Sequence, residues 1–256
     1  MMKKLTFIFS LLMLFTFGGC KKAVIEGKIF DGFGKHVIDA TVKIEGTQFI
    51  SQTNSNGEYS VGYVPGEIKV LITKQGYTDT TFTLKISTEA TYPAEATTIY
   101  EIPKENGIYL MQNGNYQPLS KAKVIQHTIK SENFWFNSQS TSYYVEYNNV
   151  LTIKKNAAPI LFFDNDLNNQ TLLTLLATED GRNMILQRNV SNGGLGFAMG
   201  DYKDTAVIIK ETYRIFKNGL ALRSANLEVG DYIFATCTKS ITEAIQGDCY
   251  VIRVIN

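Results

Sequence analysis

Short stretches in which hydrophobic and polar residues alternate recur along this chain, and clusters of Gly and Asn separate them. Residues 40–45 show the pattern clearly, because every second side chain is apolar and would share one face of a strand. Residues 172–176 are ambiguous, since so short an apolar run fits a buried strand or a single helical turn. The best helix candidate, residues 240–245, has capping-box spacing but is short. The pattern predicts an all-β protein.

The first predicted domain covers residues 23–103 and contains many short strands. We expect strands at residues 23–30, 40–45, 49–53, 58–61, 68–73 and 77–86, with a closing strand up to residue 102. The segments Asn54-Ser55-Asn56-Gly57 and Pro65-Gly66 between them are typical of tight turns, because Asn and Gly tolerate positive φ. Many short strands at this spacing predict a β-sandwich.

Turn glycines, an Ala-Thr-Val strand and a Gly-Tyr pair follow one another through this domain. They belong to the set Gly27, Asp31, Gly34, Ala40-Thr41-Val42, Ile44, Gly46-Thr47, Thr53, Gly57, Tyr59, Val64-Pro65-Gly66 and Gly76-Tyr77. In order and spacing this set resembles the carboxypeptidase regulatory-like modules, which are transthyretin-like β-sandwiches. His36 and Ile38 stand where prolines are common in that family. The resemblance implies a non-catalytic accessory module and transfers no site residues.

The second predicted domain covers residues 104–256 and repeats the same kind of pattern. Asn113-Gly114 and Asn218-Gly219 each lie between strand-like segments, and Asn-Gly in that position is the strongest short hairpin signal. No family resemblance is identified for this half. We therefore expect two β-sandwich-like domains, the second of unknown family.

The first twenty residues have the features of an export signal. Lys3 and Lys4 precede an apolar run at residues 5–17, and Gly18-Gly19-Cys20 follows. This ending resembles the lipobox of bacterial lipoproteins, although Phe17 stands where that family usually has Leu. The resemblance implies removal of residues 1–19 and lipidation of Cys20. A plain secretory signal and an uncleaved anchor are the alternatives.

Charge and composition limit the classes of partner that we expect for this protein. Lys and Arg number 25 against 24 Asp and Glu, and no dense basic run follows Lys22, so we expect no nucleic acid partner. The expected membrane contact is the lipid on Cys20. By resemblance to bacterial sorting habits, Lys21 after the cysteine is not an inner-membrane retention signal. We therefore expect lipid anchoring at the outer membrane, with the leaflet left open.

Two cysteines remain beyond Cys20, and both lie in strand-like segments near the end of the chain. In an exported protein, a disulfide between Cys237 and Cys249 is the first interpretation. Two buried free thiols are the alternative. Neither interpretation implies catalysis, because the spacing differs from a redox Cys-x-x-Cys.

We identify no catalytic or metal-binding motif in the sequence. His36 and His127 lie in different predicted domains without a metal-ligand spacing, so we expect surface histidines. The Gly-rich segment 193–200 lacks the phosphate-loop spacing and is interpreted as a loop. Residues 164–168 begin like a calcium loop but lack its Gly and Glu, so an Asx-rich turn is expected. No cofactor, metal or catalytic residue is predicted.

Aromatic residues supply the candidate binding site. Trp135 is the only tryptophan, and Trp135 and Tyr144 could stack on a sugar or anchor a partner protein if both face solvent. The alternative is that these rings fill the core of a sandwich.

The leading functional hypothesis is a lipid-anchored envelope protein that acts as a non-catalytic binding or scaffolding module for a glycan or a protein. One alternative is a carboxylate-based glycoside hydrolase in the second domain, because two of the chain's acidic residues could converge there. Another is a structural subunit of an adhesin or fimbria.

Overall fold

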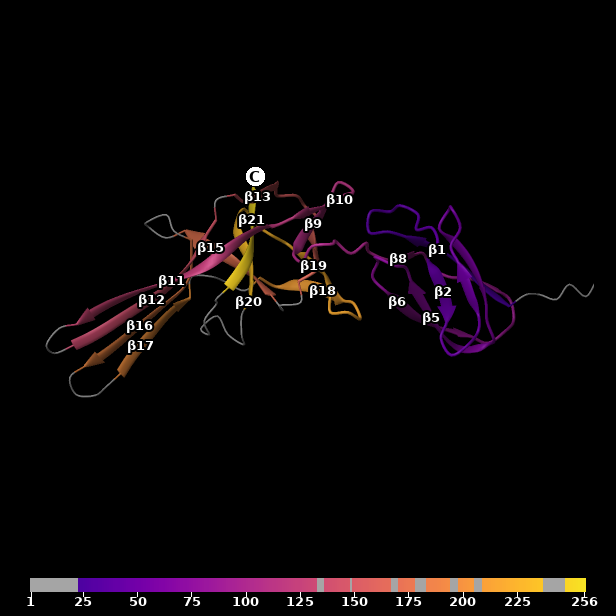
Figure 1. Ribbon diagram of the computed structural model, residues 1–256, viewed down its shortest axis with the longest axis horizontal. Helices are drawn as coiled ribbons and strands as arrows, with labels where there is room; N and C mark the ends of the chain where they lie inside the picture. Colours follow the sequence, from indigo (N-terminus) through magenta and orange to yellow (C-terminus); the bar gives the residue numbers. More distant parts are fainter. Residues whose placement is uncertain are drawn as a thin grey trace, which may run out of the picture. The chain divides into compact units, whose positions relative to one another are not determined.

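The computed structural model describes residues 23–132, 136–147, 149–166, 170–177, 183–193, 198–204, 209–236 and 247–256. Every secondary-structure element in these ranges is a β-strand, so the all-β prediction is confirmed. Among the described residues, no helix has the length and hydrophobicity needed to cross a bilayer. The chain divides into two compact units between Ile102 and Pro103 (Figure 1). The helix candidate at residues 240–245 lies outside the described residues.

The first unit consists of two small sheets. Its strands are β1 (Val24–Phe30), β2 (Thr41–Ile44), β3 (Ile50–Gln52), β4 (Glu58–Gly62), β5 (Gly66–Thr73), β6 (Thr80–Ile86), β7 (Thr91–Pro93) and β8 (Thr97–Thr98). One sheet has the order β4-β1-β7, with β8 also paired to β1, and the other has the order β3-β2-β5-β6. The six strands predicted between residues 23 and 86 are present as β1 to β6, whereas the closing strand predicted up to residue 102 is replaced by the short strands β7 and β8.

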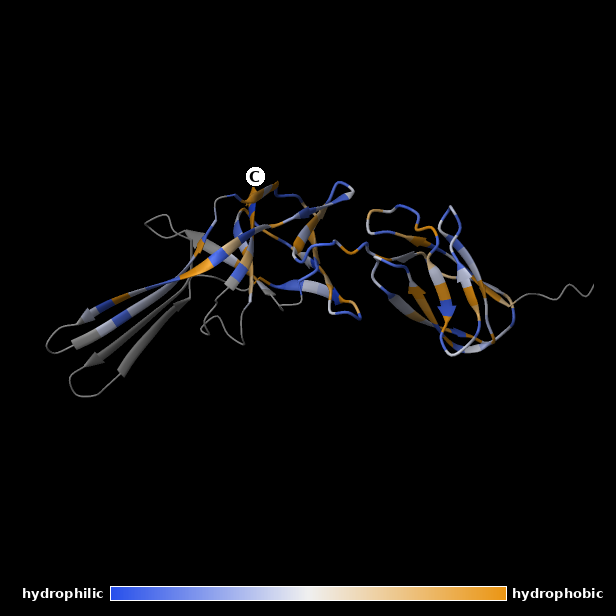
Figure 2. Cartoon of the chain, in the orientation of Figure 1, coloured by the Kyte–Doolittle hydropathy of each residue, from blue (hydrophilic) through white to orange (hydrophobic). Residues whose placement is uncertain are grey.

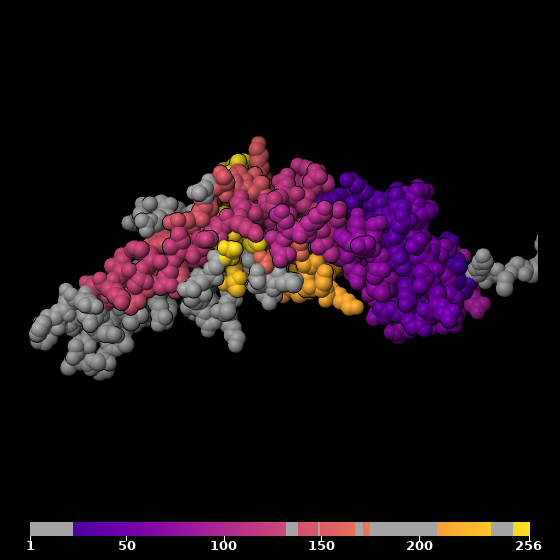
Figure 3. All heavy atoms as spheres, in the orientation of Figure 1, coloured from indigo at the N-terminus to yellow at the C-terminus, as the bar shows by residue number. Residues whose placement is uncertain are grey.

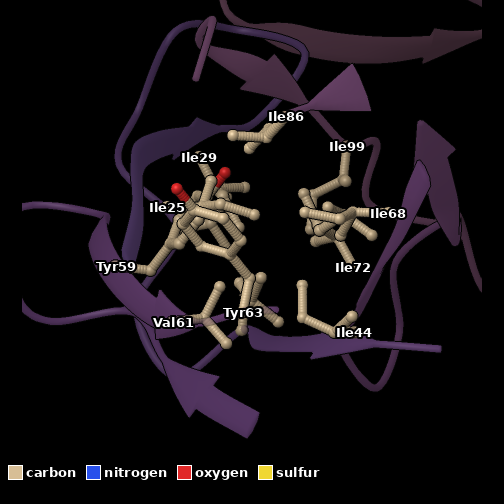
Figure 4. Packing of buried hydrophobic residues seen from close by; sticks show 14 residues of the cluster. Ile25, Ile29, Ile44, Tyr59, Val61, Tyr63, Ile68, Ile72, Ile86 and Ile99 are labelled. Carbon is tan, nitrogen blue, oxygen red and sulfur yellow. The ribbon is translucent and has the colours of Figure 1, made fainter. Parts of the chain in front are cut away.

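The two sheets enclose one hydrophobic core. Ile25 and Ile29 of β1 face Ile68 and Ile72 of β5 across the interior (Figure 4), and all four side chains are buried. Hydrophobic and hydrophilic segments follow one another along these strands (Figure 2), as period-two alternation requires. Burial of each such side chain contributes about 1.5–3 kcal/mol. The unit is a β-sandwich, and its assignment to the carboxypeptidase regulatory-like family stays a prediction.

The turn at residues 54–57 carries the chain from one sheet to the other, because β3 and β4 belong to different sheets. The Asn54 side-chain oxygen accepts hydrogen bonds from the backbone N–H of Asn56 at 2.9 Å and of Glu58 at 3.0 Å. Gly57 has a φ of 69°, and its carbonyl accepts a 2.8 Å hydrogen bond from the Ile29 N–H. The predicted Asn-Gly turn therefore fixes the crossover between the sheets.

The second unit contains a five-stranded and an eight-stranded sheet. Its strands are β9 (Ile108–Gln112), β10 (Asn115–Pro118), β11 (Ser120–Glu132), β12 (Phe136–Glu146), β13 (Leu151–Lys154), β14 (Ile160–Asp164), β15 (Gln170–Ala177), β16 (Asn183–Gly193), β17 (Ala198–Asp204), β18 (Glu211–Ile215), β19 (Ala221–Ala225), β20 (Gly230–Thr236) and β21 (Gly247–Ile255). The smaller sheet has the order β10-β9-β14-β19-β18. The ambiguous segment at residues 172–176 is part of strand β15.

Both predicted Asn-Gly hairpins are present, with different turns. Asn113 and Gly114 have φ of 53° and 75° between β9 and β10, the pair of positive values that a type I′ turn requires. In the β18–β19 hairpin only Gly219 has positive φ, and its N–H donates to the Phe216 carbonyl. The second loop is therefore longer than the first.

The larger sheet closes on itself. Its order is β11-β12-β16-β15-β20-β21-β13, with β17 also paired to β16. The first half of β11 pairs in turn with β21 through partners such as Ala122 and Cys249. A core inside this ring contains Ala122, Val145, Leu173, Ile233, Ala235, Cys249 and Val251. A second core lies between the ring and the five-stranded sheet, and includes Phe162 of β14 and Phe234 of β20, whose rings contact edge to face.

Beyond the ring, four strands continue as a long sheet within this unit. β11, β12, β16 and β17 run side by side away from the rest of the unit (Figure 1). Ile129 of β11, which is 58% exposed, shows that the sheet carries apolar residues in contact with solvent.

Candidate ligand-binding site

A polar pocket opens at the β18 edge of the five-stranded sheet. Its volume is about 250 Å³, and its described lining residues are Asp164, Asp166, Thr171, Glu211, Tyr213, Ile215, Gly219, Ala221 and Arg223. The β18–β19 hairpin that forms one wall lies at the surface of the second unit (Figure 3). The pocket thus combines a buried floor with an accessible rim.

The floor consists of one guanidinium held between two carboxylates. Arg223 donates from Nε and Nη2 to Asp164 Oδ2 at 2.7 and 2.6 Å, and from Nη1 to Glu211 Oε1 at 2.7 Å. The side chains of Arg223 and Glu211 are each 11% exposed, and that of Asp164 is 4% exposed. At this burial the charges are strongly coupled, because little solvent screens them.

Strand register places these residues on one face of the sheet. Arg223 of β19 lies opposite Phe162 of β14 and Tyr213 of β18, and Asp164 lies opposite Ala221. Directly opposed residues of antiparallel strands share a face, and here that face includes the core residue Phe162. The Arg223 guanidinium accordingly lies 5.6 Å from the Phe234 ring centroid of the facing sheet.

A second layer of hydrogen bonds holds Asp164 in place. Its Oδ1 accepts the Asp166 backbone N–H at 2.8 Å, which forms the Asx turn expected at residues 164–168. The Asp166 carboxylate in turn accepts a 2.7 Å hydrogen bond from the Tyr250 hydroxyl of β21. Burial and this carboxylate raise the pKa of Tyr250, so the hydroxyl stays a donor. The floor is therefore pre-organised.

The two carboxylate oxygens of Glu211 differ in their hydrogen bonding. Oε1 accepts from Arg223, whereas Oε2 is buried and has no hydrogen-bond partner among the described residues. Burial raises the pKa of Glu211 and of Asp164, although the Arg223 charge opposes both shifts. A buried acceptor without a donor costs about 1–3 kcal/mol, so a donor supplied by a ligand would be favourable here.

The rim carries exposed apolar groups above this floor. Tyr213 and Ile215 of β18 are 62% and 63% exposed and share the face of Glu211, because they alternate with it along the strand. An exposed ring beside buried hydrogen-bonding groups is the combination that sugar-binding sites need, since a ring face contacts C–H groups while polar atoms take the hydroxyls.

The arrangement of the two carboxylates does not match a glycosidase. In such enzymes the carboxyl groups flank the scissile bond and leave room for it. Here the Arg223 guanidinium bonds to both Asp164 and Glu211 and fills the space between them. Among the described residues, no group of three or more His, Cys, Asp and Glu side chains is placed to hold a metal ion. Asp164 and Glu211 therefore do not have the arrangement of a glycosidase pair.

Of the two aromatic residues expected to form a binding site, the structure describes only Tyr144. Trp135 lies outside the described residues, so its partnership with Tyr144 stays a prediction. Tyr143 and Tyr147 of the same segment pack against the core inside the ring, which leaves the partly buried Tyr144 on the other face of β12. Tyr144 is not among the residues that line the pocket.

The other predicted site residues take no part in the pocket. Cys249 is buried inside the ring without a disulfide partner among the described residues, and burial raises the pKa of its thiol to about 12, which disfavours the nucleophilic thiolate. Cys237 and Cys20 lie outside the described residues, and the disulfide and the lipidation stay predictions. His36 and His127 are exposed and lie in different units, as expected for surface histidines.

The sequence patterns described above do not identify Arg223, Glu211 or Tyr213 as site residues. The residues around Arg223 do, however, form a pattern that indicates an inward-facing cation. In the Asn-Gly hairpin, Ala221, Arg223 and Ala225 share one face, so a long cation lies between two small residues. Such a pattern leaves room for the side chain to turn inward. Glu211 lies on the other strand of the same hairpin, 12 residues from Arg223, whereas Asp164 comes from a strand 59 residues away and no local pattern identifies it.

No known family model matches this chain. No curated protein matches it either. Among solved structures, a type II cohesin–X–dockerin complex from Acetivibrio cellulolyticus is 23% identical over 31% of this chain, with a TM-score of 0.28, and the chain spans 58% of its length. A "putative carbohydrate binding protein" from Bacteroides uniformis is 12% identical, covering 91% of this chain and 99% of its own, with a TM-score of 0.24. A DUF3823 family protein from Parabacteroides merdae is 12% identical, covering 81% and 99%, with a TM-score of 0.20. Similarity at this level assigns no function.

Proposed function

We propose that the protein is a lipid-anchored, non-catalytic binding module of a Gram-negative envelope, and that its second unit binds a glycan in the Arg223 pocket. The observation that carries the proposal is the buried floor of Arg223, Asp164 and Glu211 beneath the exposed Tyr213 ring. Fixed donors and acceptors below an aromatic surface suit a hydroxyl-rich ligand.

The non-catalytic part of the proposal follows from the same geometry. A general acid and a nucleophile or base must both reach the substrate. Asp164 Oδ2 accepts hydrogen bonds from Arg223, and Oδ1 accepts one from a backbone N–H. The Asp164 side chain is almost fully buried. Both of its oxygens are therefore already hydrogen-bonded within the protein, which supports recognition as the role of the site.

The structural-subunit alternative finds no support in the second unit. Donor-strand assembly requires a sheet that lacks a strand until a neighbour supplies it. Here β21, the last strand of the chain, pairs with β20 on one side and with β11 and β13 on the other. The described part of the ring is therefore completed by the unit's own last strand.

Tyr213→Ala is expected to weaken glycan binding about tenfold, because loss of an aromatic contact of about 1.4 kcal/mol changes an equilibrium constant by that factor. Retention on a panel of immobilised polysaccharides measures the effect. Tyr213→Phe keeps the ring and should elute like the unmodified protein. If Tyr213→Ala also elutes unchanged while Trp135→Ala or Tyr144→Ala elutes early, the site lies on the predicted aromatic face instead.

The lipid anchor is supported by the sequence of residues 1–22, where the apolar run ends in Gly18-Gly19-Cys20. Such an anchor needs more than one acyl chain, because a single chain gives only marginal membrane binding. Multiple acylation of Cys20 would hold both units at the membrane, and the absence of an inner-membrane retention signal after Cys20 supports the outer membrane.

Mass spectrometry of the native protein tests the anchor. We expect an N-terminal peptide that begins at Cys20 and carries acyl chains, and we expect the protein in the detergent-soluble membrane fraction. Cys20→Ser should abolish acylation and release or misplace the protein. An unmodified Cys20 thiol, or mature protein in the culture medium, would contradict the anchor and leave the proposal for the pocket standing.

A further inference from the structure

The pocket carries more negative than positive charge. Asp164, Asp166 and Glu211 line it, and Arg223 is the one cation among the described lining residues. The guanidinium gives three of its N–H groups to Asp164 and Glu211, so its charge is already matched to buried carboxylates. A ligand in the pocket therefore meets a site whose positive group is neutralised and whose negative groups are in excess.

The atom of the pocket floor that lacks a partner among the described residues is a hydrogen-bond acceptor. Glu211 Oε2 is buried without a hydrogen-bond partner among the described residues. It is separate from the oxygen that binds Arg223, and a hydroxyl or ammonium group can satisfy it. A ligand carboxylate cannot do so, because it brings only acceptors and a second negative charge. Like charges at contact distance in a poorly solvated site repel each other strongly.

From this imbalance we infer that the pocket selects glycans by charge: it binds neutral or amino sugars and excludes uronic acids and other anionic sugars, with Glu211 as the residue that sets this specificity. The inference rests on the proposed glycan-binding function. It adds a ligand class to that function, and it assigns the discrimination to one carboxylate oxygen.

Affinity electrophoresis of the full mature protein tests the inference at physiological salt, where charges beyond about 8 Å are largely screened. The gels contain neutral polymers (glucan, mannan and galactan), the amino polymer chitosan, or acidic polymers (alginate, polygalacturonate and hyaluronan). We expect retardation by at least one neutral or amino polymer and at least tenfold weaker retardation by every acidic polymer.

Glu211→Gln sharpens the test, because glutamine keeps an oxygen for Arg223 Nη1 and removes the negative charge. We expect the preference for neutral over acidic polymers to fall at least tenfold in this variant. Glu228→Gln is the matched control: the Glu228 side chain is 80% exposed, pairs with Lys155 and lies outside the pocket lining. Its preference should equal that of the unmodified protein. Melting temperatures confirm that both variants fold.

The outcomes separate the two proposals. Retardation by acidic polymers as strong as by neutral ones would overturn the charge selection and leave glycan binding in place. An unchanged preference in Glu211→Gln would overturn the role of Glu211. Retardation by none of the polymers would overturn the proposed function itself, together with the inference that depends on it.

Discussion

Arg223→Met is expected to destabilise the second unit by about 3–5 kcal/mol near neutral pH, because it leaves buried carboxylates without their counter-ion. The guanidinium bonds to Asp164 at 2.6 Å and to Glu211 at 2.7 Å, and the three side chains are 11% exposed or less. Methionine is apolar and fits a similar volume, so the loss comes mainly from unpaired charge. Urea unfolding followed by circular dichroism measures it.

The cost of Arg223→Met should depend on pH. Burial already raises the pKa of Asp164 from 3.8 and of Glu211 from 4.5, against the opposing Arg223 charge. Without that charge both values rise further. A raised folded-state pKa gives a stability contribution that is fully present below the unfolded value and is lost as pH rises through the folded value. The variant should therefore be closest to the unmodified protein at about pH 4 and furthest from it at about pH 8.

Arg214→Met is the matched control for this prediction. Arg214 follows Tyr213 on β18 and therefore lies on the opposite face of the sheet. Its side chain is exposed, and its guanidinium lies 5.2 Å from the Phe216 ring centroid. Its replacement should cost about 1 kcal/mol or less, with no comparable pH dependence. If Arg223→Met and Arg214→Met lower the free energy of unfolding equally, the buried Arg223 cluster does not stabilise the unit more than an exposed arginine does.

Local signals in the sequence predicted most of the strands. Asn113-Gly114 specifies a hairpin by itself, because both residues tolerate the positive φ of 53° and 75° that the turn needs. Alternation also specifies the inward face, so Ile25, Ile29 and Ile72 lie in the core. Residues 172–176 were ambiguous because a strand buried on both faces loses alternation, and β15 is such a strand: Leu172 and Leu173 contribute to different cores.

Pairings between distant strands could not be predicted, and the candidate site depends on them. Closure of the ring needs β11 to meet β21, more than a hundred residues later in the chain. The pocket needs Asp164 to meet Arg223 and Asp166 to meet Tyr250. None of these pairs leaves a local pattern, because the partners lie far apart in the sequence: 59 residues for Asp164 and Arg223, and 84 residues for Asp166 and Tyr250. Local sequence patterns therefore predict Trp135 and Tyr144, and not the pocket residues, as the binding site.

Gly57→Ala is expected to destabilise the first unit by about 3 kcal/mol. A non-glycine residue at its φ of 69° costs about 1–2 kcal/mol. In addition, a Cβ atom would lie 2.6 Å from the Ile29 carbonyl oxygen and 3.3 Å from His36 Cβ. The first contact is with backbone, so relief requires movement of β1, and overpacking of this kind costs about 1–3 kcal/mol. The Ile29–Gly57 hydrogen bond would weaken with the same movement.

Gly34→Ala separates the two contributions. Gly34 has a similar φ of 81°, but a Cβ atom there would meet nothing within 4 Å. This variant should show the conformational cost alone, about 1–2 kcal/mol. The difference between the variants then measures the clash at the crossover turn. Calorimetry of the full mature protein provides both values, and a loss in Gly57→Ala no larger than in Gly34→Ala would mean that β1 yields to the added methyl group without strain.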